Sequence, residues 1–295
     1  MIIVKLKGGL GNQLFQYAFG RKIALRNNTE LALDVVNGFL GDPFKRAYAL
    51  HNFSLRARVA SPEEINRLIP HGRIISKLFR EYENRFVPIR NKVYFKECTQ
   101  KYDGEIFNLK ILKDVYFDGY WQSEKYFSDI EDILREELSF KYIHNPENQP
   151  CLDMIENSQS ISVHMRRYDK PGEPNASKIY GLFDQKYYSS AIKIMKERVR
   201  NPIFFVFSDD INWAKNNIPD AYQMHFILSH DMQSALSDLK FIMTCKHNII
   251  ANSSFSWWGA WLNKNTSKIV IAPKQWVATN NLKYQDVVPD KWIKL

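Results

Sequence analysis

The second half of the chain alternates between short apolar runs and longer segments with apolar residues at helical spacing. The runs are rich in β-branched and aromatic residues and predict strands at 161–164, 203–207, 224–227, 247–251 and 268–272. The segments between them predict helices at 184–199, 210–217, 231–244 and 254–263. Because strands that alternate with helices favour parallel pairing through right-handed crossovers, we expect a doubly wound α/β domain.

The first half opens with the same kind of pattern. Ile2 to Leu6 form a buried-strand run, residues 8–11 form a glycine turn, and apolar residues from Leu14 to Leu25 have helical spacing. Asn12 is the predicted N-cap of this helix, since its short side chain can accept from exposed backbone N–H groups. A glycine turn that opens a helix lets the backbone approach a ligand closely.

Further elements are predicted before residue 150. Strands are expected at 30–34 and from residue 115, and helices are expected to begin at Ser61 and near Ser123. Two prolines among polar residues mark 144–150 as a linker. We therefore predict two domains, residues 1–150 and residues 151–295.

The composition is that of an ordinary globular protein with a basic excess. Hydrophobic residues make up 45% and charged residues 25% of the 295 positions, and the formal net charge is +9. Residues 73–101 carry eight basic and three acidic side chains and so contribute +5 of this charge. Such a stretch could attract nucleic acid, anionic lipid or an anionic substrate. Because its basic residues are scattered, we interpret it as a solubilising surface.

Cysteines are few and long apolar runs are lacking. The three cysteines have no short spacing, which argues against a disulfide framework and a zinc site and fits a reducing compartment. Residues 2–6 are too few for the apolar region of a signal peptide, and no run of about 18 apolar residues occurs. We expect a cytoplasmic protein, and the basic stretch would permit a peripheral position at the inner face of the membrane.

The densest cluster of candidate site residues follows the strand predicted at 161–164. His164, Arg166, Arg167 and Asp169 lie within six residues at the carboxyl end of this strand, where open α/β sheets bind ligands. Guanidinium groups offer a planar fork of donors to phosphate oxygens and stay charged. Our hypothesis is a pyrophosphate clamp, and the alternative is a solvated charged loop.

Three more predicted strands end in polar loops. Ser208-Asp209-Asp210 offers carboxylates to a ribose or a guanine edge, although one of the two aspartates could cap the following helix. Asn252-Ser253-Ser254-Phe255 lies where a helix begins, and hydroxyls with a helix dipole can bind an anion. Lys274 could reach a phosphate but is a better match to a surface lysine. Of the nearby tryptophans, Trp261 is predicted to be core, while Trp257 and Trp258 are left open.

Together these loops predict a site for a nucleoside diphosphate. The chain has no Walker lysine and no Asp-x-Asp metal motif, and the loop at 8–11 lacks the third glycine of a dinucleotide fingerprint. A site that neutralises a leaving diphosphate with protein cations fits transfer from a nucleotide-sugar without a metal. We expect no cofactor.

Three blocks resemble glycosyltransferase family 11, the α-1,2-fucosyltransferases, in its bacterial type. They are the segment from Gly8 to Ala18, the H-x-R-R-x-D motif from His164 to Asp169, and the segment from Asn252 to Ala260. One departure is Tyr168, where many bacterial members have glycine. The resemblance implies a GT-B architecture, with two Rossmann-like domains and the active site in the cleft between them. It also implies inverting, metal-independent transfer of L-fucose from GDP-β-L-fucose to the 2-hydroxyl of a terminal β-galactoside.

The same resemblance implies roles for individual residues. Arg166 would hold the diphosphate, and His164, Asp169 and Asn12 join it in the predicted catalytic set. The predicted substrate-binding set comprises Gly9, Gly11, Gln13, Arg167, Ser208, Asp209, Asn252, Ser253, Ser254 and Phe255. Inversion needs a general base for the acceptor hydroxyl. No residue identifies itself as that base, and His164 and Asp169 are candidates.

The predicted partners are GDP-fucose and a β-galactoside acceptor, with peripheral membrane contact if the acceptor is lipid-linked. Two other interpretations stay open. One is a glycosyltransferase of the same fold with another donor sugar or linkage, because an arginine pair cannot read the sugar. The other is a non-catalytic binder of anions or nucleic acid through residues 73–101, which would show steep salt dependence. The sequence does not indicate an oligomeric state.

Overall fold

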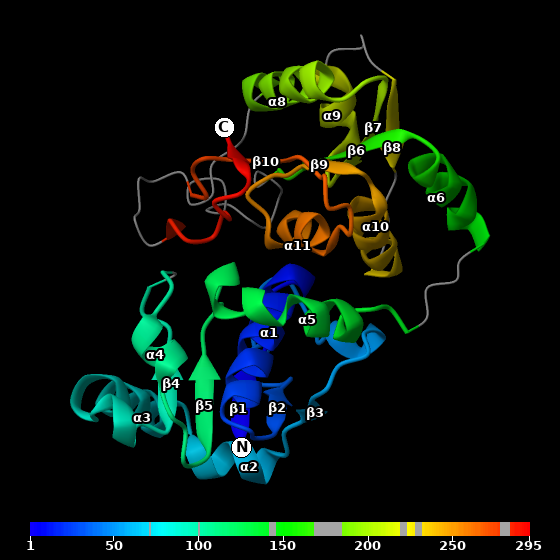
Figure 1. Ribbon diagram of the computed structural model, residues 1–295. Helices are drawn as coiled ribbons and strands as arrows, with labels where there is room; N and C mark the ends of the chain where they lie inside the picture. The colour runs from blue at the N-terminus through cyan, green and yellow to red at the C-terminus, as the bar shows by residue number, and fades with distance from the viewer. Residues whose placement is uncertain are drawn as a thin grey trace. The chain divides into compact units, whose positions relative to one another are not determined.

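The computed structural model describes residues 1–70, 72–99, 101–141, 146–167, 185–218, 223–227, 232–277 and 284–295. The chain divides into two compact units, Met1–Lys141 and Tyr142–Leu295 (Figure 1). The sequence places the boundary at residue 150. Residues 146–148 instead form a short 3-10 turn and helix α6 (Gln149–Glu156) follows, with Pro150 in its first turn, where a missing N–H costs nothing. His144 of the predicted linker lies outside the described residues.

The first unit is built on a parallel sheet with the strand order β3-β2-β1-β5-β4. The strands are β1 (Ile2–Lys5), β2 (Leu31–Asp34), β3 (Arg58–Val59), β4 (Tyr94–Lys96) and β5 (Val115–Asp118). The helices are α1 (Leu10–Arg26), α2 (Pro62–Leu68), α3 (Arg73–Phe86), α4 (Gly104–Asn108) and α5 (Glu131–Glu137). The helix predicted from Ser123 begins later, because two short 3-10 turns at 124–126 and 128–130 precede α5.

Helices cover both faces of this first sheet. Helix α1 lies close against β1, since a methyl group on Gly20 would lie 2.6 Å from Cγ2 of Val4. On the other face, Ile65 and Leu68 of α2 pack with Ile3 in a buried cluster. The predicted helix start at Ser61 is confirmed: Ser61 and Glu64 form a reciprocal capping box.

The second unit contains a parallel sheet with the strand order β11-β10-β9-β6-β7-β8. Its strands are β6 (Gln159–Met165), β7 (Pro202–Ser208), β8 (Met224–Ile227), β9 (His247–Ile249), β10 (Val270–Ala272) and β11 (Ile293–Lys294). Its helices besides α6 are α8 (Gln185–Arg198), α9 (Ile211–Asn217), α10 (Met232–Thr244) and α11 (Ser254–Leu262). Each predicted element of this half exists, with bounds shifted by at most a few residues.

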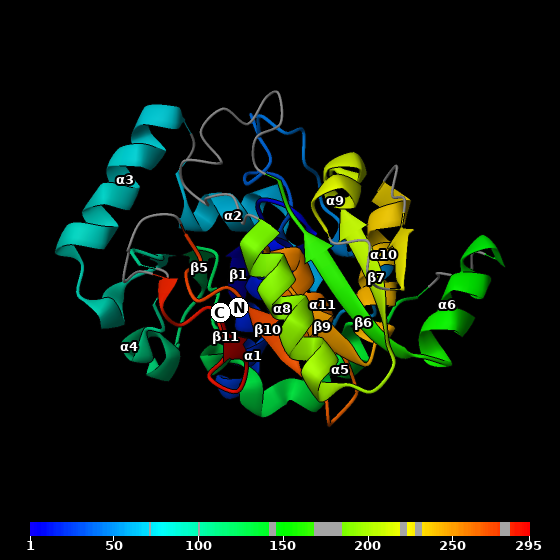
Figure 2. The same cartoon turned by 90° about the horizontal axis from the view of Figure 1, so that it is seen from above.

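Alternate residues along β7 face opposite layers of helices. Phe204 and Val206 join a buried cluster with Tyr188 of α8, whereas Phe205 and Phe207 pack with Ile242 of α10. Helix α8 lies over one face of the sheet in Figure 2, and α10 lies under the other face in Figure 1. Since both faces are covered by helices, this unit is a doubly wound α/β domain, as predicted.

Candidate functional site

The predicted donor-site loops lie at the ends of three neighbouring strands in the second unit. Strand β6 is hydrogen-bonded to β7 on one side and to β9 on the other, and both pairs are parallel. Met165 is in register with Ser208, and Val163 is in register with Ile249. Parallel strands end at the same edge of a sheet, so the loops after 165, 208 and 249 share that edge.

Asp209 braces the arginine pair. Its Oδ2 atom lies 2.9 Å from an Nη atom of Arg166, and its Oδ1 accepts from the backbone N–H of Arg167 at 2.9 Å. The Arg166 side chain is 30% exposed, so the guanidinium is held by the carboxylate and still reaches solvent. The Arg167 guanidinium lies 4.3 Å from the ring centroid of Trp213, a cation–π contact that fixes its direction.

The two adjacent aspartates therefore have different structural roles. Asp210 is the N-cap of α9, and its Oδ1 accepts from the backbone N–H of Trp213 at 2.9 Å. Ser208 accepts from the backbone N–H of Asp210 through its hydroxyl oxygen at 3.0 Å. Asp210 stabilises the helix that carries Trp213, while Asp209 faces the arginines. The sequence-based suggestion that one aspartate caps the helix is confirmed for Asp210.

His164 is buried and uncharged. It is 8% exposed, and its Nδ1 has no hydrogen-bond partner among the described residues. Burial, with a smaller effect of the nearby Arg166 charge, lowers the pKa of His164 to about 3. A base is most effective when its pKa lies near the working pH, so His164 is a poor candidate for the general base. Its ring lies 5.7 Å from that of Phe255, which joins β6 to the start of α11.

The start of α11 forms the third wall of this edge. Ser253 is the N-cap residue in an extended conformation, and its hydroxyl makes no capping bond. Ser253, Ser254 and Phe255 are each partly exposed. Asn252 is buried, and its amide donates to the backbone carbonyl of Trp276 at 3.1 Å, so it ties this loop to the loop after β10. The structure thus gives Asn252 a contact within the protein.

All three tryptophans of α11 are core residues. Trp257, Trp258 and Trp261 are at most 2% exposed. The indole N–H of Trp257 donates to the carbonyl of Val287 at 2.7 Å. Helix α11 also packs closely on α10, because a methyl group on Gly259 would lie 2.3 Å from Cγ2 of Ile242. The prediction for Trp261 is confirmed, and the other two tryptophans are assigned to the core as well.

In the first unit the glycine loop is held by glutamines. The prediction of Asn12 as N-cap is wrong: α1 begins at Leu10 with Gly9 as N-cap, and the Asn12 oxygen accepts from the Gln122 amide at 2.8 Å. Gln13 is 1% exposed. Its amide donates to the carbonyls of Gly8 and Ala47, and its oxygen accepts from a third backbone group. The structure therefore gives Gln13 a positioning role.

Of the glycines in this loop, Gly8 is the one whose backbone conformation and surroundings least allow a side chain. Its φ of 76° lies in the left-handed region, and a methyl group there would lie 2.5 Å from the Asn12 amide nitrogen. Gly9 has open space around it, and Gly11 is buried in the first turn of α1.

A charged cluster that the sequence does not predict lies at the carboxyl ends of β1, β4 and β5. Lys5 and Lys7 lie 3.2 and 2.7 Å from the carboxylate of Asp118. Burial alone would raise the pKa of Asp118, but the two lysines outweigh it and lower that pKa well below its usual value. Glu97 follows β4 and accepts from the backbone N–H groups of Tyr120 and Trp121. Burial raises the pKa of Glu97 to about 7, against these two bonds and the charge of Lys7.

A second buried ionic group stabilises the first unit. Glu137 is 5% exposed and accepts from the hydroxyl of Tyr17 and from two nitrogens of Arg21. Since Tyr17 and Arg21 belong to α1, this group joins α5 to α1 and is structural.

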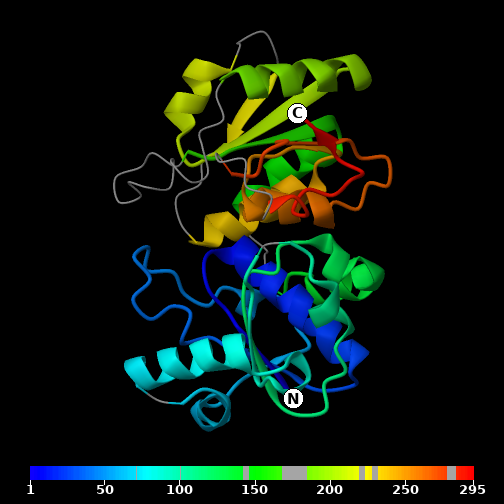
Figure 3. The ribbon, with the colours of Figure 1, turned by 90° about the vertical axis from the view of Figure 1, so that its left-hand side faces the viewer.

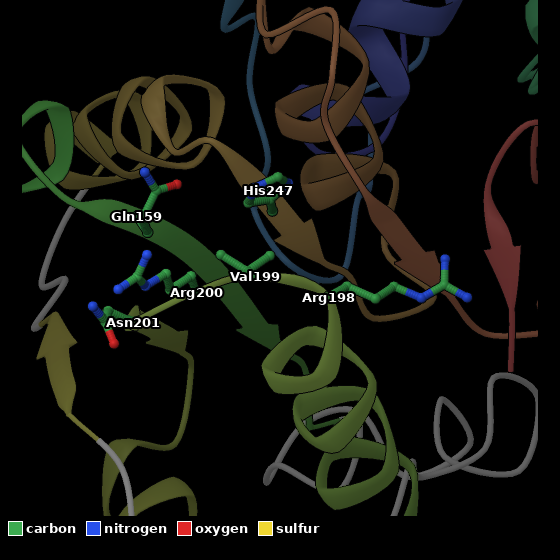
Figure 4. A pocket seen from close by; sticks show the side chains of 6 residues that line it. All are labelled: Gln159, Arg198, Val199, Arg200, Asn201 and His247. Carbon is green, nitrogen blue, oxygen red and sulfur yellow. The ribbon is translucent and has the colours of Figure 1, made fainter.

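A surface hollow of about 380 Å³ lies at the opposite edge of the second sheet (Figure 4). Gln159 and His247 begin β6 and β9, and Arg198 and Arg200 precede β7. The Arg198 side chain points away from Gln159 and Arg200 in Figure 4. Because the two arginines do not converge and the hollow is at the amino ends of the strands, it is not the predicted diphosphate site.

The described residues contain neither a cluster of metal ligands nor a membrane-spanning helix. Within the described ranges, no group of three or more His, Cys, Asp or Glu side chains could hold a metal ion. In the same ranges, no helix is long and apolar enough to cross a membrane. Asp169, a predicted catalytic residue, lies outside the described residues, as does Tyr168.

The two parallel sheets, each with helices on both faces, form two Rossmann-like domains, the architecture of the GT-B fold. The chain is similar in fold to the fucosyltransferase NodZ from Bradyrhizobium, with a TM-score of 0.51 and 15% identity over 88% of this chain and 92% of that one. At this identity the likeness shows the fold alone.

The family is narrower than the class. Residues 1–295 match the model of glycosyl transferase family 11, and the chain belongs to this family. It is 35% identical over 308 residues to an alpha-1,2-colitosyltransferase from Escherichia coli, and the alignment covers 100% of this chain and 99% of that protein. It is also 30% identical to the O-antigen biosynthesis glycosyltransferase WbnK from Escherichia coli, over 98% of this chain and 99% of that protein.

Proposed function

We propose that this glycosyltransferase transfers L-fucose from GDP-β-L-fucose to the 2-hydroxyl of a terminal β-galactoside, with inversion and without a metal. The observation that carries the proposal is the Arg166 guanidinium, held 2.9 Å from Asp209 at the carboxyl end of a central strand. Arg166 would bind the diphosphate and stabilise the negative charge that develops on the departing GDP. Ser253 and Ser254 would add hydroxyl and backbone donors at the start of α11.

The other predicted residues take supporting roles in this proposal. Asp209 positions Arg166, so the cation does not have to reorganise when the leaving group develops charge. Neutral His164 adds no charge beside the fucose, and its ring lies 5.7 Å from that of Phe255. In the first unit, Gln13 shapes the glycine loop rather than contacting substrate. The acceptor hydroxyl attacks the face opposite GDP, and its proton goes to a base outside this set.

A second donor is favoured by one relative. The Escherichia coli protein that is 35% identical is named a colitosyltransferase. Colitose is a fucose that lacks the 3-hydroxyl, and an arginine that binds the diphosphate does not distinguish the two sugars. GDP-colitose is therefore the alternative donor. The interpretation as a nucleic-acid binder is set aside, because the chain belongs to a glycosyltransferase family.

The test measures GDP release from GDP-fucose and from GDP-colitose, with lactose and other β-galactosides, with and without a chelator. We expect turnover with GDP-fucose that the chelator does not change, and an α-1,2 linkage in the product by NMR. Faster turnover with GDP-colitose would move the assignment to that donor. Absence of turnover with every β-galactoside would exclude both, and loss with chelator would exclude the metal-free step alone.

Two variants test the site itself. Arg166→Ala should reduce kcat/KM by at least about a hundredfold, the effect of removing one donor to a developing anion. Arg200→Ala is the matched control, because this exposed arginine lies at the opposite edge of the same sheet. Equal activity in the two variants would show that the strand-end cluster is only a charged surface loop.

A further inference from the structure

Helix α3 exposes most of its apolar residues to solvent. Of the fourteen large apolar side chains that are exposed in the described part of the chain, five lie on this one helix. They are Ile74, Ile75, Leu78, Tyr82 and Phe86, with exposed fractions of 74%, 60%, 61%, 58% and 67%. At 100° per residue these positions fall within one stripe of about 120°. The helix lies along the outer side of β4 in the first unit (Figures 1 and 3).

The opposite side of α3 is fixed to the sheet by polar groups. Glu83 is 6% exposed and accepts from the backbone N–H groups of Val93 and Tyr94 at 2.8 and 3.2 Å. The Arg80 guanidinium lies 5.7 Å from the Tyr94 ring centroid. Phe79 adds an apolar contact to the buried cluster beside β1. A surface helix normally buries its apolar stripe, so this orientation is reversed and leaves the stripe for another surface.

Charges within and beside the stripe are mainly positive, and Arg85 lies within it at 100° per residue. Among the side chains that the structure describes between residues 72 and 99, the exposed basic ones are Lys77, Arg85, Arg90 and Lys96. Glu81 is the one exposed acidic side chain of the same stretch, because Glu83 is buried and Glu97 is partly buried. The basic excess of this segment therefore reaches solvent, while most of its acidic groups are turned inward.

These features select one kind of partner. A second copy of the chain docked by the same face would bring the basic residues of both copies together, at an electrostatic cost. A lipid surface offers an apolar layer for the stripe and anionic headgroups for the cations above it. The aliphatic parts of Lys77 and Arg85 can lie along the stripe while their charges reach the headgroups.

We propose that α3 binds the surface of an anionic membrane and lies in the plane of its headgroups. Ile74, Leu78 and Tyr82 enter the boundary between headgroups and acyl chains, and Lys77 and Arg85 contact lipid phosphates. The contact would hold the enzyme where lipid-linked glycans are available. The proposal does not depend on the donor sugar.

The experiment is co-sedimentation of the full chain with vesicles of phosphatidylcholine that contain about one third phosphatidylglycerol. We expect binding that weakens as salt rises and is at least about tenfold weaker on phosphatidylcholine alone. Leu78→Ser/Phe86→Ser should lower the partition coefficient at least about tenfold. Lys77→Glu/Arg85→Glu should lower it similarly and remove most of the salt dependence.

Leu112→Ser is the matched control, because Leu112 is 83% exposed in the same unit but lies outside α3. The control should bind like wild type, and all variants should keep wild-type circular dichroism and GDP release with a soluble acceptor. Failure of wild type to bind anionic vesicles would overturn the proposal. Binding of Leu78→Ser/Phe86→Ser to anionic vesicles as strong as that of wild type would also overturn the proposal. So would a wild-type dimer in sedimentation equilibrium that is absent in this variant, because the stripe would then be an interface between two copies of the chain. Each of these results leaves the assignment of the donor site unaffected.

Discussion

Replacing the two adjacent aspartates after β7 should separate activity from stability. Asp209→Ala removes the carboxylate 2.9 Å from Arg166 and the acceptor of the Arg167 N–H. Asp210→Ala removes only the cap of α9. The two variants differ by one position and delete the same group, so each serves as the control for the other.

The magnitudes follow from the contacts. A hydrogen bond to a charged group contributes about 1.5–3 kcal/mol, which corresponds to a loss of about 10- to 150-fold in kcat/KM for Asp209→Ala. Loss of an N-cap costs about 1 kcal/mol of unfolding free energy, or about 2–4 °C in Tm for a unit of this size. We therefore expect Asp210→Ala to keep near wild-type turnover and to melt slightly earlier.

The assay is GDP release under saturating acceptor, combined with calorimetry of each variant. Asp209→Asn should fall between wild type and Asp209→Ala, because its amide oxygen can still accept from the Arg167 N–H while the charge is lost. Full activity in Asp209→Ala would refute the positioning role of Asp209. A loss of activity in Asp210→Ala equal to that in Asp209→Ala would show that the whole loop, not the carboxylate, determines turnover.

Three further predictions concern stability and the glycine loop. Burial raises the pKa of Glu97 from 4.5 to about 7, so between these pH values the native state binds a proton that the unfolded state has lost. The contribution of Glu97 to the unfolding free energy is therefore full below pH 4.5 and is lost as pH rises to about 7. Glu97→Gln should flatten the dependence of the urea-derived unfolding free energy on pH in this range, and an unchanged slope would contradict the assignment. Gly259→Ala should destabilise the protein by at least about 1–3 kcal/mol, since the new methyl group would lie 2.3 Å from a side chain of α10. Gly9 has open space around it, so Gly9→Ala should melt at the wild-type Tm, and it should lose activity only if substrate approaches the glycine loop. Glu137→Gln should cost about 1.5–3 kcal/mol in the same urea assay, because it takes the carboxylate away from the partly buried Arg21 cation. The exposed neighbour substitution Glu136→Gln should cost almost nothing.

The fold of the second unit follows from sequence periodicity. The apolar runs around Val163 and Val206 are short and bounded by polar loops, so their length and spacing identify strands. The order of the strands in the sheet, in contrast, does not follow from local periodicity. The position of Asp209 after β7 could be predicted, but its contact with Arg166 depends on β7 lying beside β6.

The first unit shows where periodicity stops being informative. The spacing of residues 74–86 separates an apolar from a polar face, but it does not say which face is buried. The scattered basic residues of 73–101 indicate a solubilising surface, and the sequence does not show that Glu83 and Arg80 pack inward against β4. Glu97 likewise resembles any surface glutamate until β4 and β5 are paired and its carboxylate meets the backbone of Tyr120. Asn12 failed as a cap because Gly9 already starts the helix.

The outermost strands of both sheets are short, and this bears on how the chain avoids aggregation. Strands β3 and β11 have two residues each, β4 has three and β8 has four. Parallel sheets assemble slowly, and an unpaired edge is a template for pairing with another molecule during that time. Edges of two to four residues offer few backbone groups to a foreign strand. The long strands β6 and β7, with seven residues each, are placed in the interior, where both of their sides are occupied.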